Sequence, residues 1–359
     1  MHTKKRAWVT ILLLVAAIKI FSLFPAAVEQ YYSNGFYPVI SGLLRFLFGW
    51  LPFSVGDILY AVTAVYLIVH LVIALRLIFK KQAGRFFWWN SLRRLAFYSL
   101  LVYVVFNVCW GLNYNRLGTA YQMQLQLKTY STEELATVMA VVVDRLDSTN
   151  TKAFAGRRAY SSKKMLFHEA ANSYRAAEKK YTQLSYSIRS VKPSLFSYLG
   201  DYLGYTGYYN PFTGEAQVNT TVPVFVQPFT TCHEMGHQLG YAKENEANFA
   251  GYLSGKSSLD PLFRYSVYFD LYNYGIRELF GRDSLLAIAL NSRKPVQVKK
   301  DNLALQAFYA RFENPVEPYI KTLYGQYLRA NEQPSGMLSY NEVMAFMVAY
   351  YKKYGAAAL

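Results

Sequence analysis

Two histidines and the glutamate between them are the residues best placed to do chemistry in this chain. His233 and His237 are four positions apart, and Glu234 directly follows the first of them. Residues four apart share one face of an α-helix, so both imidazoles can bind a single Zn²⁺ ion. Glu234 can then reach a zinc-activated water and take its proton, as the glutamate of an HExxH motif does. The spacing therefore predicts a zinc-dependent hydrolase in which Glu234 is the catalytic base.

The residues around this motif favour a buried active-site helix. Positions 229–232 before it, and Met235 and Gly236 inside it, carry no charge. The chain has only five histidines, and two of them fall in the motif. Short HExxH patterns also occur by chance in helices that bind nothing, and both features weigh against that interpretation.

An acidic segment, Glu244 to Asn248, follows the motif and can supply a further ligand. Gly240 lies between the two, where a left-handed glycine can end one helix and turn the chain back toward the metal. Catalytic zinc sites use three protein ligands and leave a fourth position for water. Glu244 and Glu246 are both candidates, but residues two apart do not share a helix face, so only one can point at the metal. We favour Glu244, with Glu246 as the alternative.

The pair Glu244 and Asn248 resembles the ExxxD element of the gluzincin metallopeptidases. That resemblance implies that Glu244 binds zinc and that Asn248 supports a histidine ligand through a hydrogen bond. Asn248 stands where gluzincins have an aspartate, and the gap between His237 and Glu244 is shorter than in most of them. Glu246 therefore stays open as the third ligand.

The elements that must position these residues divide the chain into two parts. Hydrophobic residues make up 53% of the 359 residues and charged residues 17%, below the roughly 25% that is usual in soluble domains. Three apolar stretches, at about residues 8–27, 55–79 and 95–112, have roughly the 20 residues that a membrane-spanning helix needs. We expect residues 1–112 to form a membrane domain with three transmembrane helices. Residues 113–359 would then form a zincin-like domain.

Lysine and arginine residues give the expected orientation. They gather at the N-terminus and between the second and third apolar stretches, whereas residues 29–57 contain only Arg45. Basic loops stay in the cytoplasm, so we expect a multi-pass protein of the bacterial cell membrane with a cytoplasmic N-terminus and an extracytoplasmic C-terminal domain. Residues 39–52 are apolar but short, and are interpreted as an interfacial or re-entrant helix. If they crossed the membrane, the C-terminal domain would be cytoplasmic.

The part beyond residue 113 has the periodicity of a mainly α domain with a small β element. Ser131 to Glu134 is a capping box that opens a helix through about Asp147. Gly214 to Val222 is the expected β element, and it is a candidate for the edge strand that pairs with an extended substrate. Further helices are expected at residues 163–180, 229–239, 243–253, 260–280, 302–311, 315–329 and 340–354.

Other polar residues and the overall charge give weaker indications. The net charge of +16 fits lipid headgroups or cell-wall polyanions, and nucleic acid is not expected because the basic residues of the N-terminal part flank apolar segments. Two cysteines, Cys109 and Cys232, exclude a disulfide scaffold. His70 and His168 are interpreted as structural. A donor to the oxyanion is needed, and the candidates are Tyr205, Tyr208, Tyr209, Tyr265 and Tyr268.

The run from His233 to Phe249, with Tyr209 to Ala216 before it, resembles the bacterial DUF3810 family. Residues 327–331 and 339–340 extend the resemblance, which covers nearly the whole chain. It implies a membrane protein with three spans and a site like that of a zinc peptidase, but it fixes no substrate.

These observations together predict a membrane-anchored zinc metallopeptidase that binds Zn²⁺, a lipid bilayer and a peptide or protein substrate. One alternative is a zinc amidase that acts on cell-wall peptides. Another is an inactive metal-binding membrane protein that binds a partner, but a structural site would not need Glu234. Intramembrane proteolysis is disfavoured because the motif lies far beyond the last apolar stretch. The sequence indicates no oligomeric state.

Overall fold

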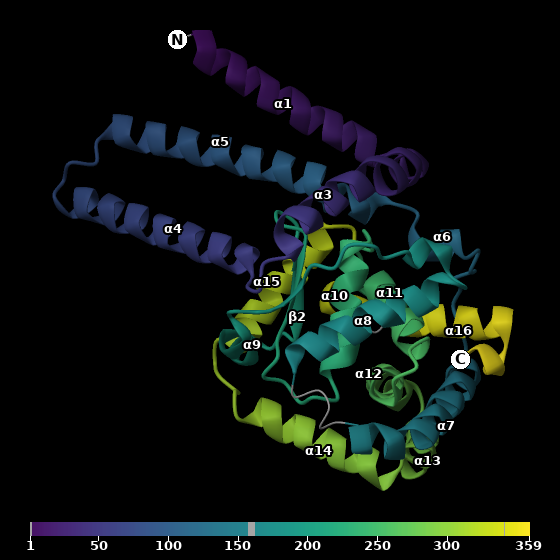
Figure 1. The fold of residues 1–359 in the computed structure, drawn as a ribbon. Helices are drawn as coiled ribbons and strands as arrows, with labels where there is room; N and C mark the ends of the chain where they lie inside the picture. Colours follow the sequence, from purple (N-terminus) through teal and green to yellow (C-terminus); the bar gives the residue numbers. More distant parts are fainter. Residues whose placement is uncertain (1, 157–161, 341) are drawn as a thin grey trace.

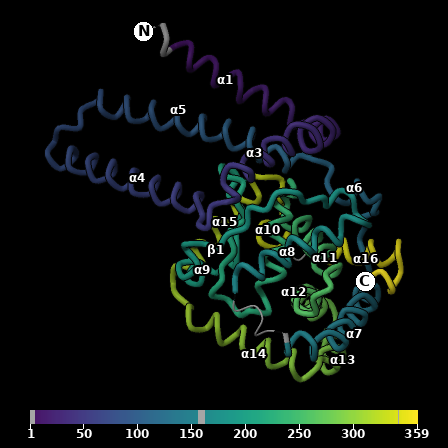
Figure 2. Tube along the Cα trace, in the orientation of Figure 1, coloured from purple at the N-terminus to yellow at the C-terminus, as the bar shows by residue number. Residues whose placement is uncertain are grey.

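The computed structural model describes residues 2–156, 162–340 and 342–359. Figures 1 and 2 show a helical body from which three long helices, α1, α4 and α5, project. The fold is mainly α with a small β-sheet and long apolar helices near the N-terminus, as the sequence predicts.

Two of the projecting helices are long and apolar enough to span a membrane. They are α4 (Val55–Phe79) and α5 (Arg85–Cys109). α1 (His2–Ser22) qualifies only together with the helical stretch from Pro25 to Gly49, and the two are bent by 99° at the break between them. The described residues therefore contain two such helices, or three if the bent pair forms one span.

The bounds of α1 and α5 differ from those of the predicted spans. Polar residues extend α5 at its start, and a proline follows the end of α1. α4 coincides with the second predicted span. α5 begins at Arg85 instead of about residue 95, because arginine is a good helix former and can extend its charged end into water. α1 ends at Ser22, before Pro25, because the residue preceding a proline disfavours helical geometry.

Residues 39–52, predicted to form an interfacial or re-entrant helix, lie mostly in α3 (Tyr37–Gly49). Short α2 (Pro25–Ala27) and the π-helical η1 (Val28–Phe36) connect it to α1. One face of α3 is buried against the helical body. The other face exposes apolar side chains to the surroundings, namely Val39, Leu43, Phe46, Leu47 and the following Trp50.

The helical body is built around α7 (Thr132–Gly156), which packs along α12 (Pro261–Arg282). The predicted capping box of α7 is confirmed, since the backbone N of Glu134 donates to Ser131 Oγ at 3.2 Å and Ser131 N donates to the Glu134 carboxylate at 2.9 Å. Apolar residues at helical spacing form the buried face of α7: Leu135, Val138, Met139, Val142 and Leu146.

A three-stranded sheet covers one side of α10 (Gln227–Gln238). The strands are β1 (Val191–Pro193), β2 (Gly207–Asn210) and β3 (Glu215–Val218), in the order β1-β3-β2. β3 is parallel to β1 and antiparallel to β2. The interpretation of residues 214–222 as the edge strand is therefore wrong. β3 is the buried central strand, and β1 and β2 are the two edge strands. The pattern of one short strand cannot reveal this order because the order depends on distant partners.

The remaining elements enclose α10 or form the outer layers. α11 packs along α10, while α8 and α12 also contact it. These and the other elements are η2 (Gly111–Asn115), α6 (Gly118–Gln122), α8 (Lys163–Glu178), η4 (Thr182–Leu184), α9 (Ser197–Leu203), α11 (Glu244–Lys256), α13 (Ser284–Ser292), α14 (Val296–Ala310), α15 (Glu317–Ala330), η5 (Gly336–Tyr340), α16 (Val343–Tyr354) and η6 (Ala356–Ala358).

Candidate metal centre

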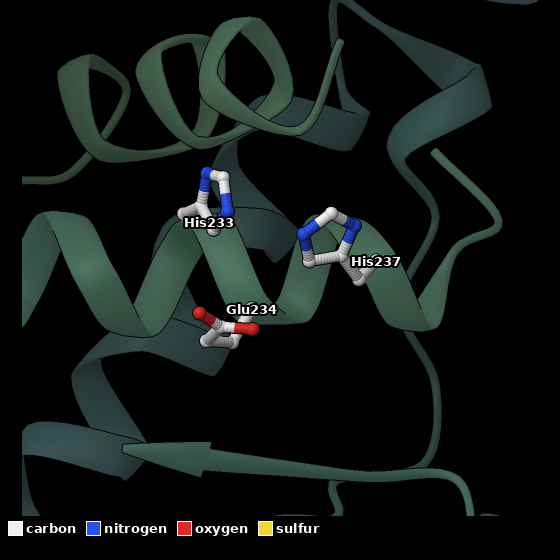
Figure 3. A group of neighbouring side chains, drawn as sticks. All are labelled: His233, Glu234 and His237. Atoms are coloured by element: carbon white, nitrogen blue, oxygen red, sulfur yellow. The ribbon is translucent and has the colours of Figure 1, made fainter. Parts of the chain in front are cut away.

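The HExxH residues lie on α10, every residue of which is buried. Figure 3 shows the imidazoles of His233 and His237 on one side of the helix and the Glu234 carboxylate on a different side, toward a strand. The two rings have centroids 4.7 Å apart and are nearly perpendicular. The predicted shared face of the two histidines is therefore formed by local helix geometry.

A hydrogen bond on the far side of each ring fixes both imidazoles. His233 Nδ1 lies 2.7 Å from Asn248 Oδ1, and His237 Nδ1 lies 2.7 Å from the carbonyl oxygen of Tyr241. Both partners are oxygens that only accept, so each Nδ1 carries the ring proton. Each Nε2 then presents a lone pair to the same region, which is the orientation that a metal-binding histidine requires.

Glu244 completes the group from the first turn of α11. Its Oε2 lies 3.2 Å from His233 Nε2 and 3.5 Å from His237 Nε2. Its Oε1 accepts a hydrogen bond from the Tyr324 hydroxyl at 2.9 Å, and its backbone N donates to Gln333 Oε1 at 2.9 Å. These contacts hold the carboxylate in place against the two imidazoles.

Glu246, the alternative third ligand, points elsewhere. Its carboxylate lies against Gly118, where an added Cβ would overlap it. Burial raises the pKa of Glu246, while Lys243 and Arg116 lower it, so its electrostatic neighbours differ from those of Glu244. Of the two candidate acids, only Glu244 is beside the histidines.

Glu234 is the second carboxylate near the imidazoles. One nitrogen of each histidine and one Glu234 oxygen all lie within 4.8 Å of one another. Burial raises the pKa of Glu234 to about 7, although the two histidines act to lower it. Both carboxylates border the site, but Glu244 Oε2 faces both Nε2 atoms closely. Glu244 is therefore within ion-pair distance of both imidazoles, and Glu234 lies at a separate position beside them.

The residues present fit a zinc ion. Two imidazole nitrogens and one carboxylate oxygen are a common donor set of catalytic zinc sites. Among the described residues, Glu234 Oε2 and Glu244 Oε2 are buried and have no hydrogen-bond donor. Buried carboxylate oxygens without a donor are costly. A divalent cation would offset this cost for both.

The charges of the ligand set are strongly coupled. Burial raises the pKa of Glu244, but the two imidazoles lower it more, so its pKa falls well below the ordinary value. Burial lowers the pKa of His237, but Glu244 raises it more, to about 9. Without a metal, a protonated His237 therefore pairs with the ionised Glu244, and a cation that binds there must displace that proton.

Residues from the N-terminal third hold the end of α10, which sequence reasoning missed. The last carbonyl groups of a helix lack partners within it. Tyr37 Oη and Ser41 Oγ donate to the carbonyl of Gln238 at 2.9 and 3.0 Å, and Trp110 Nε1 donates to that of His237 at 3.1 Å. In the sequence, only the positions of Tyr37, Ser41 and Trp110 in or beside apolar stretches hinted that they bond to the end of α10.

The sheet approaches the site through Gly207 of β2. A Cβ added there would lie 2.7 Å from Glu234 Oε1 and 2.9 Å from Thr230 Cγ2. A residue without a side chain is therefore required for the strand to pass this close to Glu234. The backbone of β2 consequently lies directly beside α10.

The five candidate tyrosines are dispersed. Tyr209 packs against Trp110 with ring centroids 5.2 Å apart, close to His237. Tyr208 donates to Asp57, and Tyr205 packs against Tyr208. Tyr265 and Tyr268 bond Asp301 and the carbonyl of Leu359 in the helical body.

Two tyrosines that sequence reasoning missed lie closer to the ligands. Tyr324 bonds Glu244, and the ring of Tyr340 is stacked on that of His233 at 6.3 Å between centroids. They lie 80 residues or more from these partners in sequence, so only the fold brings them together.

The remaining polar candidates lie in ordinary settings. His70 Nδ1 contacts the carbonyl of Tyr66 within α4. His168 lines a surface pocket together with Arg175 and Arg189. Cys109 and Cys232 are both free thiols. None of these residues belongs to the metal centre.

Comparison with known proteins places the chain in a family. A family model described as "Protein of unknown function (DUF3810)" matches residues 32–348. The chain belongs to the DUF3810 family. We found no matching curated protein and no matching solved structure. The match extends from η1 to α16 and includes every residue of the metal centre, so the family resemblance seen in the sequence is confirmed.

Proposed function

We propose that this DUF3810 protein is a membrane-anchored zinc metallopeptidase with His233, His237 and Glu244 as its metal ligands. The observation that carries the proposal is the approach of Glu244 Oε2 to within 3.2 and 3.5 Å of two Nε2 atoms. Both imidazoles are already oriented by acceptors on their other nitrogens. A zinc ion bound there would polarise a substrate carbonyl and lower the pKa of a water molecule.

Glu234 is placed to move the proton. It is buried at the metal centre but separate from the three ligands, and burial raises its pKa to about 7. A carboxylate with a pKa near neutrality can both accept a proton from the attacking water and return it to the leaving amine. In this mechanism Glu234 supplies the proton transfer, and the histidines and Glu244 supply the binding site.

The edge of β2 that pairs with no strand among the described residues offers a place for an extended peptide. Asn219 N donates to the carbonyl of Thr206 at 2.8 Å, which fixes the alternation of bonded pairs along β2 and β3. The backbone groups of Gly207 and Tyr209 are then directed away from β3, toward the unpaired edge. A substrate can add to that edge by main-chain hydrogen bonds. β2 therefore replaces residues 214–222 as the substrate strand.

Two tyrosine hydroxyls can stabilise negative charge on the substrate. Tyr324 bonds Glu244, and the hydroxyls of Tyr324 and Tyr340 lie 3.4 Å apart. Burial raises the pKa of both tyrosines, so both stay protonated and able to donate. We propose that one of them donates to the developing oxyanion.

The arrangement of the long helices supports a cytoplasmic N-terminus and an extracytoplasmic helical body. Figure 1 shows the N-terminus and the connection between α4 and α5 at the helix ends far from the body. Both regions are rich in lysine and arginine. Basic segments at one end of a helix group favour the cytoplasmic side of a bacterial membrane.

The test uses the full chain in lipid nanodiscs, loaded with zinc and offered peptides that include cell-wall peptides. We expect wild type to hold one zinc ion per chain and to cleave at least one peptide. Glu234→Gln should keep the zinc and lose about 10²–10⁴-fold in kcat/KM, because it removes only the proton carrier. Zinc that does not bind under saturating conditions would overturn the proposal.

The third ligand is tested by a matched pair of substitutions on α11. Glu244→Gln should weaken zinc binding, because a neutral amide is a poor zinc ligand. Glu246→Gln removes an equally buried carboxylate that faces Gly118, so zinc affinity should stay near that of wild type. Zinc affinities are compared by chelator competition. The reverse pattern would transfer the ligand role to Glu246.

A further inference from the structure

The walls of the metal centre include the ends of the membrane helices. Trp110 directly follows α5, and its indole lies 5.8 Å from the ring of His237. Tyr208 on β2 donates to Asp57 in the first turn of α4. The end of α5 and the start of α4 therefore each contact a proposed catalytic element through a single pair of side chains.

Two groups of tyrosines lie between the ends of α4 and α5 and the proposed metal centre. Tyr60 on α4 packs near Tyr208 with ring centroids 6.5 Å apart. On the other side of the site, the hydroxyls of Tyr114 and Tyr327 lie 3.3 Å apart, and Tyr327 stacks on Tyr324 at 5.9 Å. Tyr324 in turn bonds Glu244. The metal centre thus lies at the base of the membrane helices.

Charged side chains of the sheet hold the start of α4 and the end of α3. Glu215 accepts hydrogen bonds from Val55 N and Gly56 N at 3.2 and 2.6 Å, at the positive end of the α4 dipole. Lys192 donates to carbonyl groups of Phe48 and Gly49 at 3.1 Å, at the negative end of α3. These bonds fix the distance between the metal centre and the membrane, which a flexible tether would not do.

The substrate strand itself runs from the metal centre to α4. Gly207 at its beginning is beside Glu234, and Asn210 at its end is beside Gly56, where an added Cβ would overlap the Asn210 amide. Three residues of extended chain separate these points, which is a path of about 10 Å. A peptide paired with β2 would therefore reach the base of α4 within a few residues of the scissile bond.

Exposed apolar residues surround the same end of the body. Tyr319 and Leu323 on α15 are 72% and 61% exposed, and Tyr198 and Leu199 on α9 are also exposed. α9 contacts α15, and Figure 1 shows both on the side of the body from which α4 leaves. Apolar side chains grouped in this way indicate contact with lipid or with an apolar partner.

Helix α4 leaves one flank open in the membrane. In the most apolar part of α4, no residue is buried by the described part of the chain, whereas α5 packs against α1. An apolar helix belonging to another protein can therefore lie beside α4 without displacing part of this chain.

From these contacts we infer that the substrate is a polypeptide anchored in the same membrane and cut a few residues from its apolar segment. The inference rests on the proposed peptidase function and specifies its substrate class. An anchored substrate is confined to the membrane surface where β2 ends, which raises its effective concentration at the site. A freely diffusing peptide lacks this advantage.

The test measures capture by the full chain carrying Glu234→Gln, loaded with zinc in nanodiscs, so that binding is observed without cleavage. The probes are peptides with a randomised stretch two to ten residues from an apolar anchor, on either side, and the same stretches without an anchor. We expect anchored peptides with spacers of about three to six residues to be captured at least about tenfold better. Equal capture of both kinds, or capture of neither, would overturn the inference.

A substitution on the apolar surface gives a second readout. Leu323→Glu should reduce capture of anchored peptides about tenfold, because it places a charge where an apolar segment enters. Leu285→Glu is the matched control, since Leu285 is 79% exposed on α13, away from α4. Equal effects of the two substitutions would count against the inference. The proposed function fails separately, if zinc-loaded wild type cleaves none of the captured peptides.

Discussion

At the scale of single residues, Asn248 shows how this site departs from the aspartate of gluzincins. Its Oδ1 faces His233 Nδ1 at 2.7 Å, and its Nδ2 donates to the carbonyl of Tyr340 at 3.2 Å. An aspartate could accept from His233 but could not donate to Tyr340. The Asn248 amide therefore orients the His233 imidazole and also holds η5 beside α11. Tyr340, the last residue of η5, stacks on His233.

Removing this orienting contact should weaken zinc binding. Asn248→Ala is expected to lower zinc affinity about 10–100-fold, because the imidazole loses the partner that fixes its tautomer. Asn245→Ala is the control, since Asn245 lies on the same helix but bonds Glu342. Chelator competition on the full chain measures both. Unchanged affinity in Asn248→Ala would contradict the orienting role.

Asp270 on α12 should make stability depend on pH. Its Oδ2 is buried without a hydrogen-bond donor among the described residues, and burial raises its pKa from 3.8 to about 8. Because the folded state holds this proton more tightly, the contribution of Asp270 to stability is greatest below pH 4 and falls as the pH rises toward 8. Asp270→Asn keeps the shape without the charge, and it should raise the free energy of unfolding by about 1–3 kcal/mol at pH 8.

Thermal unfolding from pH 4 to pH 9 tests this expectation. The stabilising effect of Asp270→Asn should be small near pH 4, grow through neutrality and level off above pH 8. A difference that does not change with pH would mean that folding does not raise the pKa of Asp270.

At the scale of elements, a buried ion pair joins η1 to the segment after α5. Arg116 binds both carboxylate oxygens of Glu29 at 2.9 and 2.7 Å, and its Nη1 donates to the carbonyl of Gly240 at 3.1 Å. The same arginine thus connects the N-terminal segment to the turn that follows the catalytic helix.

Breaking this pair should be costly. Arg116→Ala leaves Glu29 buried without its partner, so we expect a loss of about 3–5 kcal/mol in the free energy of unfolding. Arg293→Ala is the control because its pair with Asp144 is solvent-exposed, and it should cost less than about 1 kcal/mol. Thermal unfolding in detergent compares them, and similar losses would contradict this account of the pair.

The elements differ in how far local sequence predicts them. α8, α10 and α11 agree closely with the predicted residues 163–180, 229–239 and 243–253. Local signals mark the ends of α10, since Pro228 lies in its first turn and Gly240, with a φ of 84°, follows its last residues. α13 (Ser284–Ser292) was missed, since nine residues joined directly to α12 leave a weak local signal. The edge strand was misassigned because pairing of strands is a long-range property.

At the scale of the whole molecule, the two parts of the chain are not joined by a simple linker. Residues 28–49 and the end of α5 supply hydrogen-bond donors to the catalytic helix, and Tyr209 packs on Trp110. The predicted boundary at residue 112 thus passes through packed contacts. The membrane segments are part of what holds the metal centre together.

A chain shortened to residues 113–359 should therefore be impaired. It loses the partners of the α10 carbonyl groups and exposes Tyr209, so we expect a lower unfolding temperature and weaker zinc binding than in the full chain. A chain that lacks only residues 1–22 is the control, because α1 packs mainly on α5 and the donors Tyr37, Ser41 and Trp110 are kept. Calorimetry and chelator competition measure the effects. Full zinc affinity in residues 113–359 would show that these contacts are dispensable.

The sequence by itself determined the features that depend on neighbouring residues. The spacing of His233 and His237 places both imidazoles on one helix face, and the length and apolar character of α4 suit it to a membrane. Such properties follow from helix geometry and solvation, which act over a few turns of chain.

Only the tertiary structure decided which distant groups meet. Glu244 and Glu246 are equivalent by local pattern, and the packing of α11 against α10 turns Glu244 toward the histidines and Glu246 toward Gly118. Tyr37 reaches Gln238 across 201 positions, and Tyr324 reaches Glu244 across 80. No local pattern encodes these contacts, because their geometry is set by how the membrane helices, the sheet and the helical body pack around α10.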